Sequence, residues 1–419
     1  MPILAGQQPP TSRIGFGPLS PAERIESLDT LRGMALLMIL IANMPAFNSP
    51  VYYLADAEQQ WSTSHVDHIA DTFVRTFIDY ESVAVFSFLL GFGFAMQLLR
   101  AYAVGQSFLV LYVRRLLALI AIGVVHILLI WTGDILLLYG ILGFPLLLFR
   151  RFPPKLILAV AIVLYLVSPI RWELSVVRHL REDTAGVSTS ADVTAEAQAD
   201  RERAREQVKS SVQAYAHGSW TEIAAQRIRD YLYYVKHNQA MTVFPMFLFG
   251  LFAGRSKLFE NLVSRRRGFR TALVCSASLA FPLIALLRVL YLPGLPAWTA
   301  LLRPAVFAVE HAALVVFYIS WIIWLQGRVK WRLLSAIAAA GRLSLTNYLL
   351  QSVLCTLIFY RYGLGLYGQI GSAPGLFIAL GVFALQLWLS VLWSRHFRLG
   401  PVESVLRSVS YGRVQALRS

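Results

Sequence analysis

The chain has 419 residues, of which 57% are hydrophobic and 15% are charged, and its mean hydropathy is +0.58. Soluble domains usually have about 25% charged residues, so this composition excludes an ordinary soluble protein and indicates an integral membrane protein. The formal net charge is +15, but the basic residues are scattered around the ends of apolar segments, which argues against nucleic-acid binding.

The N-terminal tail, residues 1–32, is predicted to lie in the cytoplasm. Residues 1–24 are polar and rich in Pro and Gly, and they lack an apolar core after a basic start. We therefore expect no secretory signal peptide.

Apolar segments then recur along the chain and are predicted to form one all-α transmembrane domain over residues 33–393. About ten helices are expected, at 33–47, 78–98, 114–131, 134–150, 155–171, 240–254, 270–292, 303–325, 342–360 and 373–393. We place both termini in the cytoplasm, because the short outer loops then carry only Arg75, Arg303 and Arg361 among the basic residues. The expected protein is a multi-pass bundle in the plasma (inner) membrane.

The stretch SLDTLRGMALLMILIAN puts polar groups at the start of the first span. Asp29 and Arg32 are three residues apart, so on a helix they share a face and can form an ion pair. Asn43 follows about three turns later on a similar face. The pair is either a helix-start carboxylate with a snorkelling arginine or the mouth of a site.

The outer stretch WSTSHVDHIADTF contains His65 and His68. Together with Asp67 and Asp71 they have the spacing of metal ligands on one helix face. No further ligand is evident elsewhere in the sequence, so we expect no metal site.

The stretch GVVHILLIWTGDILLLYG contains His126 near the outer end of the third span and Asp134 at the start of the fourth. WTGD is predicted to be a tight turn, so the two helices should form an antiparallel hairpin. A buried histidine can act as a general base, although a structural, hydrogen-bonded histidine fits the spacing equally well. Asp134 could also be the N-cap of the fourth helix.

A long outer loop is expected at about residues 172–239, and the stretch from Arg171 to Ala240 has ten acidic and ten basic residues. Its stretch EAQADRERAREQVKSSVQAYA is a strong helix former with mixed charges. We consider a solvated connector the simpler interpretation and a lid over an outer site the alternative.

The eighth span contains the adjacent pair Glu310 and His311. Ionisable groups inside a membrane are costly and usually mark a functional site. A carboxyl group there needs a partner, and Arg303, seven residues earlier on a similar face, is one candidate.

Polar residues also gather at the start of the ninth span, in GRLSLTNYLLQS. Arg342, Asn347 and Gln351 form either interhelical hydrogen bonds or a ligand surface. The C-terminal segment, residues 394–419, is predicted to be a cytoplasmic amphipathic tail with Glu403 in a basic setting.

Several stretches together resemble one family. RIESLDTLRGMALLMILIAN, FSFLLGFGFAM, GVVHILLIWTGDILLLYGILG, GRLSLTNYLLQSVLCTLIFYRYGLGL and FRLGPVESVLRSVSYGR are similar to the YeiB-like family, the domain of unknown function numbered 418. The resemblance covers nearly the whole chain, and GDIL and LTNYL are its specific parts. The family has no assigned function.

The stretch SLDTLRG also resembles, more distantly, the start of transmembrane acyltransferases. That resemblance implies transfer of an acyl group from cytoplasmic acyl-CoA to a sugar across the membrane. Arg32 matches an arginine of the bacterial O-acyltransferases, but Asn43 stands where they have a histidine. An amide cannot take up a proton as a general base. The base would therefore be His126, or else His65 or His68.

We therefore expect an acyltransferase that modifies an envelope glycan or lipid. His126 would be the base, oriented by Asp134 or a nearby polar group, while Arg32 and the basic cytoplasmic rim hold the coenzyme A phosphates. Asn43 and Asn347 would donate hydrogen bonds to the thioester carbonyl. Acyl-CoA is the expected co-substrate, with no permanently bound cofactor.

Two other classes of function remain as alternatives. One is a transporter or lipid-handling protein in which Glu310 and His126 relay protons. The other is a non-catalytic partner of an envelope-synthesis complex. The expected partners are the lipid bilayer and, as a further option, other copies of the chain.

Overall fold

The computed structural model describes residues 26–54, 64–167, 190–237 and 243–417, apart from residues 104, 106, 263, 293, 327, 329–331 and 416. In these ranges every regular element is a helix, as the composition predicts. Most of the predicted N-terminal tail lies outside the described residues. The first helix begins at Glu26, earlier than the predicted start of the first span at residue 33.

Six helical segments of the described chain are long and apolar enough to cross a membrane. Helices of 22 to 25 residues are about 33–37 Å long, which exceeds the roughly 30 Å of a bilayer core. They are α1 (Glu26–Asn48), α4 (Asp79–Ala103), which continues α3 (His65–Phe77), α5 (Phe108–Leu129), α11 (Arg266–Leu290), α12 (Arg303–Gln326) and α15 (Ser372–His396). The protein is therefore a multi-pass membrane protein.

A seventh crossing arises if a bent pair of helices is counted as one span. α13 (Arg332–Arg342) and α14 (Ser344–Phe359) meet at an angle of 89°. The predicted single helix at 342–360 is thus only the second half of a broken element, which begins ten residues earlier than expected.

The predicted number of ten spans is not confirmed, because three of the expected segments are short helices. They are α6 (Leu136–Leu146), extended by the 3-10 turn η2 (Leu147–Arg151), the helix Pro154–Val167, and α10 (Val243–Arg255). The 11 residues of α6 and the 13 of α10 reach only about 16–20 Å. Hydropathy measures the length of an apolar segment, but it does not show where the regular helix is interrupted. Around α6 the interruptions are the turn before Leu136 and Pro145 near its end.

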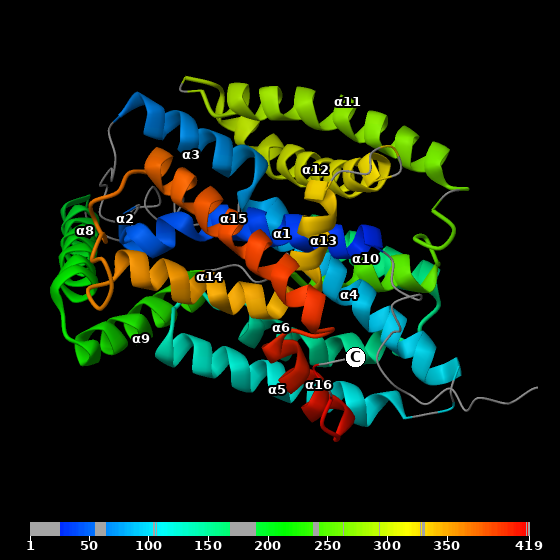
Figure 1. Cartoon of the computed structure of the whole chain (residues 1–419). Helices are drawn as coiled ribbons and strands as arrows, with labels where there is room; N and C mark the ends of the chain where they lie inside the picture. Colours follow the sequence, from blue (N-terminus) through cyan, green and yellow to red (C-terminus); the bar gives the residue numbers. More distant parts are fainter. Residues whose placement is uncertain are drawn as a thin grey trace, which may run out of the picture.

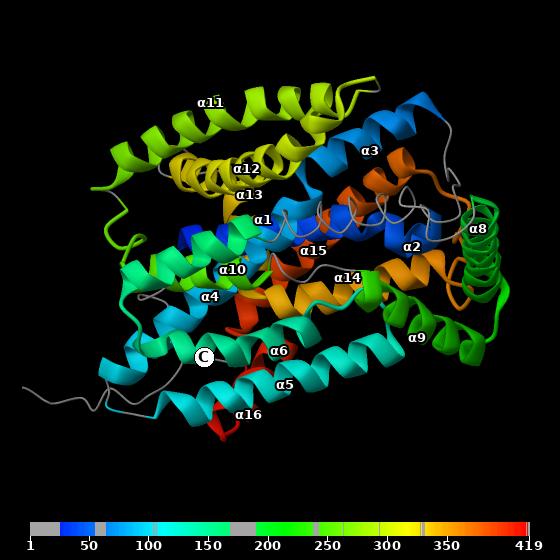
Figure 2. The ribbon, with the colours of Figure 1, turned by 180° about the vertical axis from the view of Figure 1, so that it is seen from behind.

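The helices are arranged around α1, which runs through the middle of the bundle. α11 and α12 lie on one side of α1, and α5 and α6 lie on the other (Figures 1 and 2). α1 and α13 touch backbone to backbone, because a Cβ atom on Gly341 would lie 1.8 Å from the carbonyl oxygen of Asp29. Such contacts are typical of membrane helices with small residues at their interfaces.

A similar contact joins α4 to α10. A Cβ on Gly91 would lie 2.0 Å from the carbonyl oxygen of Phe247, and one on Gly250 would lie 2.0 Å from that of Phe88. These glycines let the two backbones approach closely, which brings the short α10 against the long α4.

One end of the bundle, which we call the cap end, is covered by α8 (Ser190–Val212) and α9 (Trp220–His237), joined by the π-helical turn η3 (Gln213–His217) (Figure 1). Tyr215 of η3 stacks on Tyr360 at 4.3 Å, and Ser211 bonds to Tyr367 at 2.9 Å. The described part of the long loop is therefore docked on the bundle and is not a solvated connector. The opposite end, where α1 begins and α16 (Pro401–Tyr411) packs, is the tail end.

Candidate functional site

At the cap end, a hairpin brings His126 and Asp134 together. Nδ1 of His126, at the end of α5, lies 2.8 Å from Oδ2 of Asp134, and both side chains are fully buried. The other oxygen of Asp134 accepts a hydrogen bond from the backbone N–H of Leu137 at 2.7 Å. Asp134 thus both caps α6 and orients the histidine, so the two interpretations of its sequence position hold together.

The second nitrogen of this histidine is the chemically available one. Nε2 of His126 is buried and has no hydrogen-bond partner within the described ranges of the chain. When a carboxylate accepts the Nδ1 proton, Nε2 becomes the basic nitrogen. The pair therefore has the arrangement of an oriented general base.

Aromatic residues enclose the pair. The ring of Tyr348 in α14 lies 5.4 Å from that of His126, and its hydroxyl donates to the carbonyl of Gly133 at 3.1 Å. Trp131 stacks on Phe47 at 3.9 Å, and its indole Nε1 is buried without a partner among the described residues. An unpaired donor thus lies in the turn beside the histidine that supplies the basic nitrogen.

α9 covers this hairpin and places an arginine there. The Thr132 hydroxyl donates to the Arg227 carbonyl at 3.2 Å, which fixes α9 on the turn. The Arg227 side chain is fully buried, and none of its three nitrogens has a hydrogen-bond partner in the part of the chain that the structure describes. Its guanidinium lies 4.9 Å above the ring of Trp220.

Two tyrosines lie near these groups, Tyr234 in α9 and Tyr360 directly after α14. Burial and then the nearby Tyr231 and Asp134 raise the pKa of Tyr234 to about 12. The hydroxyl of Tyr360, which lies near Arg227, is buried without a hydrogen-bond partner among the described residues. Arg227, Tyr231 and Tyr234 are spaced four and three residues apart, so one face of α9 is turned toward the hairpin.

The sequence did not single out Arg227, Trp131 or Tyr360 as site residues. Trp131 belongs to the hairpin turn that was identified, but an indole there gave no separate signal. Arg227 lies in a loop rich in charged residues, where one arginine does not stand out. The amphipathic run of aromatic residues that follows it was the available clue.

Comparisons with known proteins find relatives that match nearly the whole chain. The chain is 36% identical to the uncharacterized protein YxaH of Bacillus subtilis over 408 residues, covering 93% of this chain and 94% of the relative. It is 29% identical to the uncharacterized protein YeiB of Escherichia coli over 407 residues, covering 93% and 96%. The model of the protein of unknown function DUF418 matches residues 253–413.

The chain belongs to the DUF418, or YeiB-like, family. The resemblance seen in its motifs is thereby confirmed. No solved structure matches the chain. The distant relationship to transmembrane acyltransferases is not shown by these comparisons and stays a prediction.

At the tail end of the DUF418 chain, the predicted ion pair forms. Nη1 of Arg32 donates to Oδ1 of Asp29 at 2.7 Å, and the Arg32 side chain is 31% exposed. Gly341 packs on the backbone of Asp29, and Arg342 follows it as the last residue of α13. The end of α13 therefore lies beside the first turn of α1.

Arg32 and His126 do not meet. Arg32 lies close enough to Arg115 of α5 for their charges to repel. Arg115 precedes His126 by 11 residues of the same helix, a distance of about 16 Å along its axis. The two predicted parts of the site therefore occupy different levels of the bundle.

The predicted amides have different surroundings. Asn43 is half-buried in α1. The amide nitrogen of Asn347 donates to the carbonyl of Ala340 at 3.1 Å and to the Ser390 hydroxyl at 2.9 Å, which uses both of its N–H groups. Asn347 therefore has no free N–H group for the thioester carbonyl that it was predicted to contact.

Gln351 and Glu403 also join helices. The amide nitrogen of Gln351 donates to the carbonyl of Leu36 at 3.2 Å and to Gln386 at 3.0 Å. Glu403 of α16 accepts the backbone N–H groups of Leu345 and Thr346 at 2.7 and 3.0 Å. It thereby caps α14 and fastens the C-terminal helix to the bundle.

A second buried cluster lies between α4 and α12. Nδ1 of His311 hydrogen-bonds to Oε1 of Glu81 and lies 3.4 Å from Oε2 of Glu310. Arg303, one candidate partner of Glu310, instead donates to the carbonyl of Leu290 at 3.0 Å and does not pair with that carboxyl in the described structure. Sequence reasoning missed Glu81, which lies 230 residues from His311.

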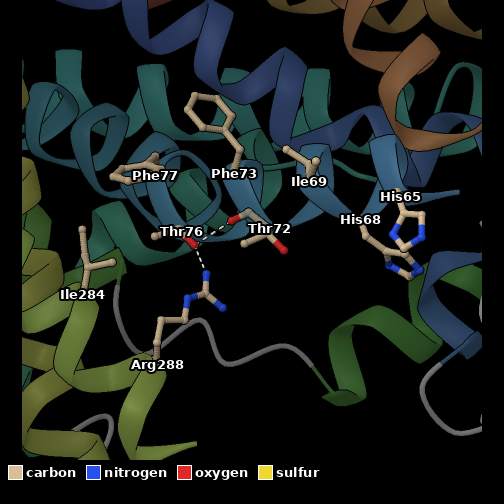
Figure 3. Close-up of a pocket in the computed structure, with 9 residues that line it drawn as sticks. All are labelled: His65, His68, Ile69, Thr72, Phe73, Thr76, Phe77, Ile284 and Arg288. Atoms are coloured by element: carbon tan, nitrogen blue, oxygen red, sulfur yellow. Dashed lines mark hydrogen bonds between the residues drawn. The ribbon is translucent and has the colours of Figure 1, made fainter. Parts of the chain in front are cut away.

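His65 and His68 line an open groove of about 500 Å³ between α3 and α11 (Figure 3). The groove also contains Arg288, which donates to the Thr76 hydroxyl. Asp67, on the same turn as the histidines, is buried and accepts the backbone N–H of Ala373 at 2.7 Å. Asp67 thereby caps the start of α15.

Proposed function

We propose that this membrane protein transfers an acyl group from acyl-CoA to a hydroxyl or amine of an envelope glycan or lipid. The observation that supports this best is the buried His126–Asp134 pair, with its 2.8 Å bond on Nδ1 and its unpartnered Nε2. A general base must have one nitrogen fixed and the other directed at the acceptor proton.

In the proposed reaction, Nε2 of His126 takes the proton of the acceptor hydroxyl or amine. The acceptor atom attacks the thioester carbonyl carbon, and its new bond to that carbon replaces the carbon–sulfur bond. The imidazolium then returns the proton to the leaving coenzyme A thiolate. Asp134 stabilises the imidazolium between the two transfers.

Two unpaired donors at the cap end support this proposal, the indole of Trp131 beside His126 and the guanidinium of Arg227, whose backbone lies on the hairpin turn. A buried guanidinium without a counter-charge is costly, and so is a buried indole N–H without an acceptor. An oxyanion or an anionic substrate group beside Arg227 and Trp131 would accept hydrogen bonds from both side chains. In our proposal they take the role that the sequence assigned to Asn347.

The rest of the mechanism depends on how the chain sits in the membrane. We propose that it lies in the plasma membrane with the tail end in the cytoplasm, as the distribution of Lys and Arg predicts. The three short apolar helices would then complete the ten segments. Arg32 and the basic rim would hold the coenzyme A phosphates, and the flexible pantetheine arm would reach toward His126.

Labelled acetyl-CoA supplied to membranes that contain the full chain tests this function. We expect label in an envelope glycan or lipid, lost in His126→Gln and retained in His68→Gln, which changes an exposed histidine of the groove. Calorimetry with detergent-purified protein should show acetyl-CoA binding that Arg32→Ala weakens. Folded wild-type protein that binds no acetyl-CoA and transfers no label would contradict the proposal.

The transporter alternative has one observation in its favour, the buried carboxylates beside His311. It predicts substrate flux in proteoliposomes that follows a pH gradient. That flux would be lost in Glu310→Gln and would not require acetyl-CoA.

A further inference from the structure

Three side chains with metal-ligand chemistry converge between α4 and α12. Glu81 contributes from the first turn of α4, and Glu310 and His311 contribute from α12. One ligand atom from each lies within 4.8 Å of the other two. All three residues are buried, with exposures of 0%, 2% and 8%.

The contacts within this cluster do not balance. Both Glu81 and Glu310 approach the same atom, Nδ1 of His311. A single ring N–H can fully satisfy only one carboxylate oxygen. In addition, Oε2 of Glu81 is buried and has no hydrogen-bond partner among the residues that the structure describes. The cluster therefore has an unused oxygen as well as two carboxylates for one imidazole.

The surrounding charges do not supply the missing cation. Arg288 lies near enough to Glu310 to interact with its charge, but it lines the groove and donates to Thr76 (Figure 3). Asp79, two residues before Glu81, adds a further carboxyl group close by, and the charge of Arg75 acts on Asp79. Since buried charges need compensation, a cation held directly between the carboxylates would remove the imbalance.

Aromatic packing holds the imidazole in place. The ring of His311 lies 3.9 Å from that of Phe307 and 5.1 Å from that of Tyr80. The hydroxyl of Tyr318 in α12 donates to the carbonyl of Phe77 at 2.6 Å, just before α4 begins. The two helices are thus fixed beside the cluster, as a preorganised ligand set requires.

We infer that Glu81, Glu310 and His311 bind a divalent first-row transition-metal ion such as Zn²⁺ or Mn²⁺. One imidazole with two carboxylates suits these ions, whereas Mg²⁺ and Ca²⁺ prefer oxygen ligands alone. Three protein ligands leave at least one coordination position open. The sequence led us to expect no metal, because its only evident ligand cluster was on α3. This inference is independent of acyl transfer.

Metal analysis of the purified full-length protein tests the site. After growth with Zn²⁺ and Mn²⁺ and purification without chelator, we expect about one metal ion per chain. Glu81→Gln and Glu310→Gln should each lose most of it. Glu260→Gln is the matched control, because Glu260 is exposed and pairs only with Lys257 on the surface.

Thermal unfolding gives a second measurement that does not depend on the variants. A chelator should lower the unfolding temperature of the wild type, and added Zn²⁺ or Mn²⁺ should restore it. Wild-type protein that is folded, contains no metal and does not shift with either ion would overturn the inference. Retention of full metal content in both Gln variants would overturn it too. Stability that depends on pH but not on metal would assign the cluster to a shared proton instead.

Discussion

Two buried histidines of this protein meet carboxylates, and the two sites differ in the number of carboxylates. At the cap end, His126 has one carboxylate on Nδ1, and its Nε2 is without a partner. Between α4 and α12, His311 has two carboxylates directed at one nitrogen. One carboxylate fixes the tautomer and leaves a basic nitrogen, whereas two create an excess of negative charge. The first arrangement suits proton transfer and the second suits a cation.

The largest expected effect comes from neutralising the single carboxylate of the first site, Asp134. Asp134→Asn should reduce acyl transfer by about 10²–10⁴-fold, because the amide no longer stabilises the imidazolium. The metal content should not change. Measuring label transfer and metal together checks both statements, and transfer near the wild-type level would remove Asp134 from the proposed mechanism.

The fold should survive this substitution, since Asn can still accept the Leu137 N–H as an N-cap. A wild-type elution profile in size-exclusion chromatography is the control. Loss of both transfer and folding would leave the decision to His126→Gln, which has no role in capping α6.

A second contrast lies within α9, where Arg227 has no hydrogen-bond partner and Asp230 has several. Arg227→Met should abolish acyl transfer, yet it should stabilise the substrate-free protein by about 1–4 kcal/mol. The reason is that an apolar side chain replaces an uncompensated buried charge. Opposite effects on activity and unfolding temperature would identify Arg227 as a ligand contact.

If Arg227→Met instead lowered the unfolding temperature by several degrees, the stacking on Trp220 would be its main role. Arg229→Met provides a control on the same helix, because Nε of Arg229 donates a hydrogen bond to Gln226 at 3.0 Å and Arg229, unlike Arg227, is not a buried arginine without a partner. We expect that variant to retain transfer.

The smallest expected effect concerns Asp230, which accepts hydrogen bonds from Tyr53 and Tyr215 at 2.7 Å each. Burial raises the pKa of this carboxyl, although the hydrogen bonds of Tyr215, Tyr53 and Gln226 oppose the rise. The folded state therefore prefers the protonated form. Its stabilising contribution is complete below the unfolded pKa of about 3.9 and is lost as pH rises through the folded pKa.

Asp230→Asn should remove this pH dependence while α8 and α9 remain docked on the cap end. The measurement is the unfolding temperature of wild type and variant between pH 4 and 7, where the difference should change in favour of Asn as pH rises. Parallel curves would show that the titration of Asp230 is not linked to folding.

Local spacing determined which parts of the site could be predicted. The WTGD turn placed Asp134 beside His126, and three-residue spacing paired Asp29 with Arg32. Both pairs depend on a single turn or helix, so a sequence pattern is enough. The same patterns also located the long apolar helices.

Contacts between distant segments could not be predicted in this way. Glu81 meets His311 only after α4 packs against α12, and no local pattern reports that. Arg227 reaches the hairpin because α9 folds back over the bundle. The number of full-length spans was overestimated for a related reason, since hydropathy does not distinguish a short apolar helix buried in protein from one that crosses a membrane.

The docking of α16 has a practical consequence for anyone who expresses this protein. Glu403 satisfies two backbone N–H groups at the start of α14, inside the sharp junction between α13 and α14. A chain truncated before Pro401 would leave both groups without that acceptor, at a cost of about 1–3 kcal/mol each where they are buried. Affinity tags therefore belong after the final residues, and an inactive truncation should be read first as a damaged helix junction.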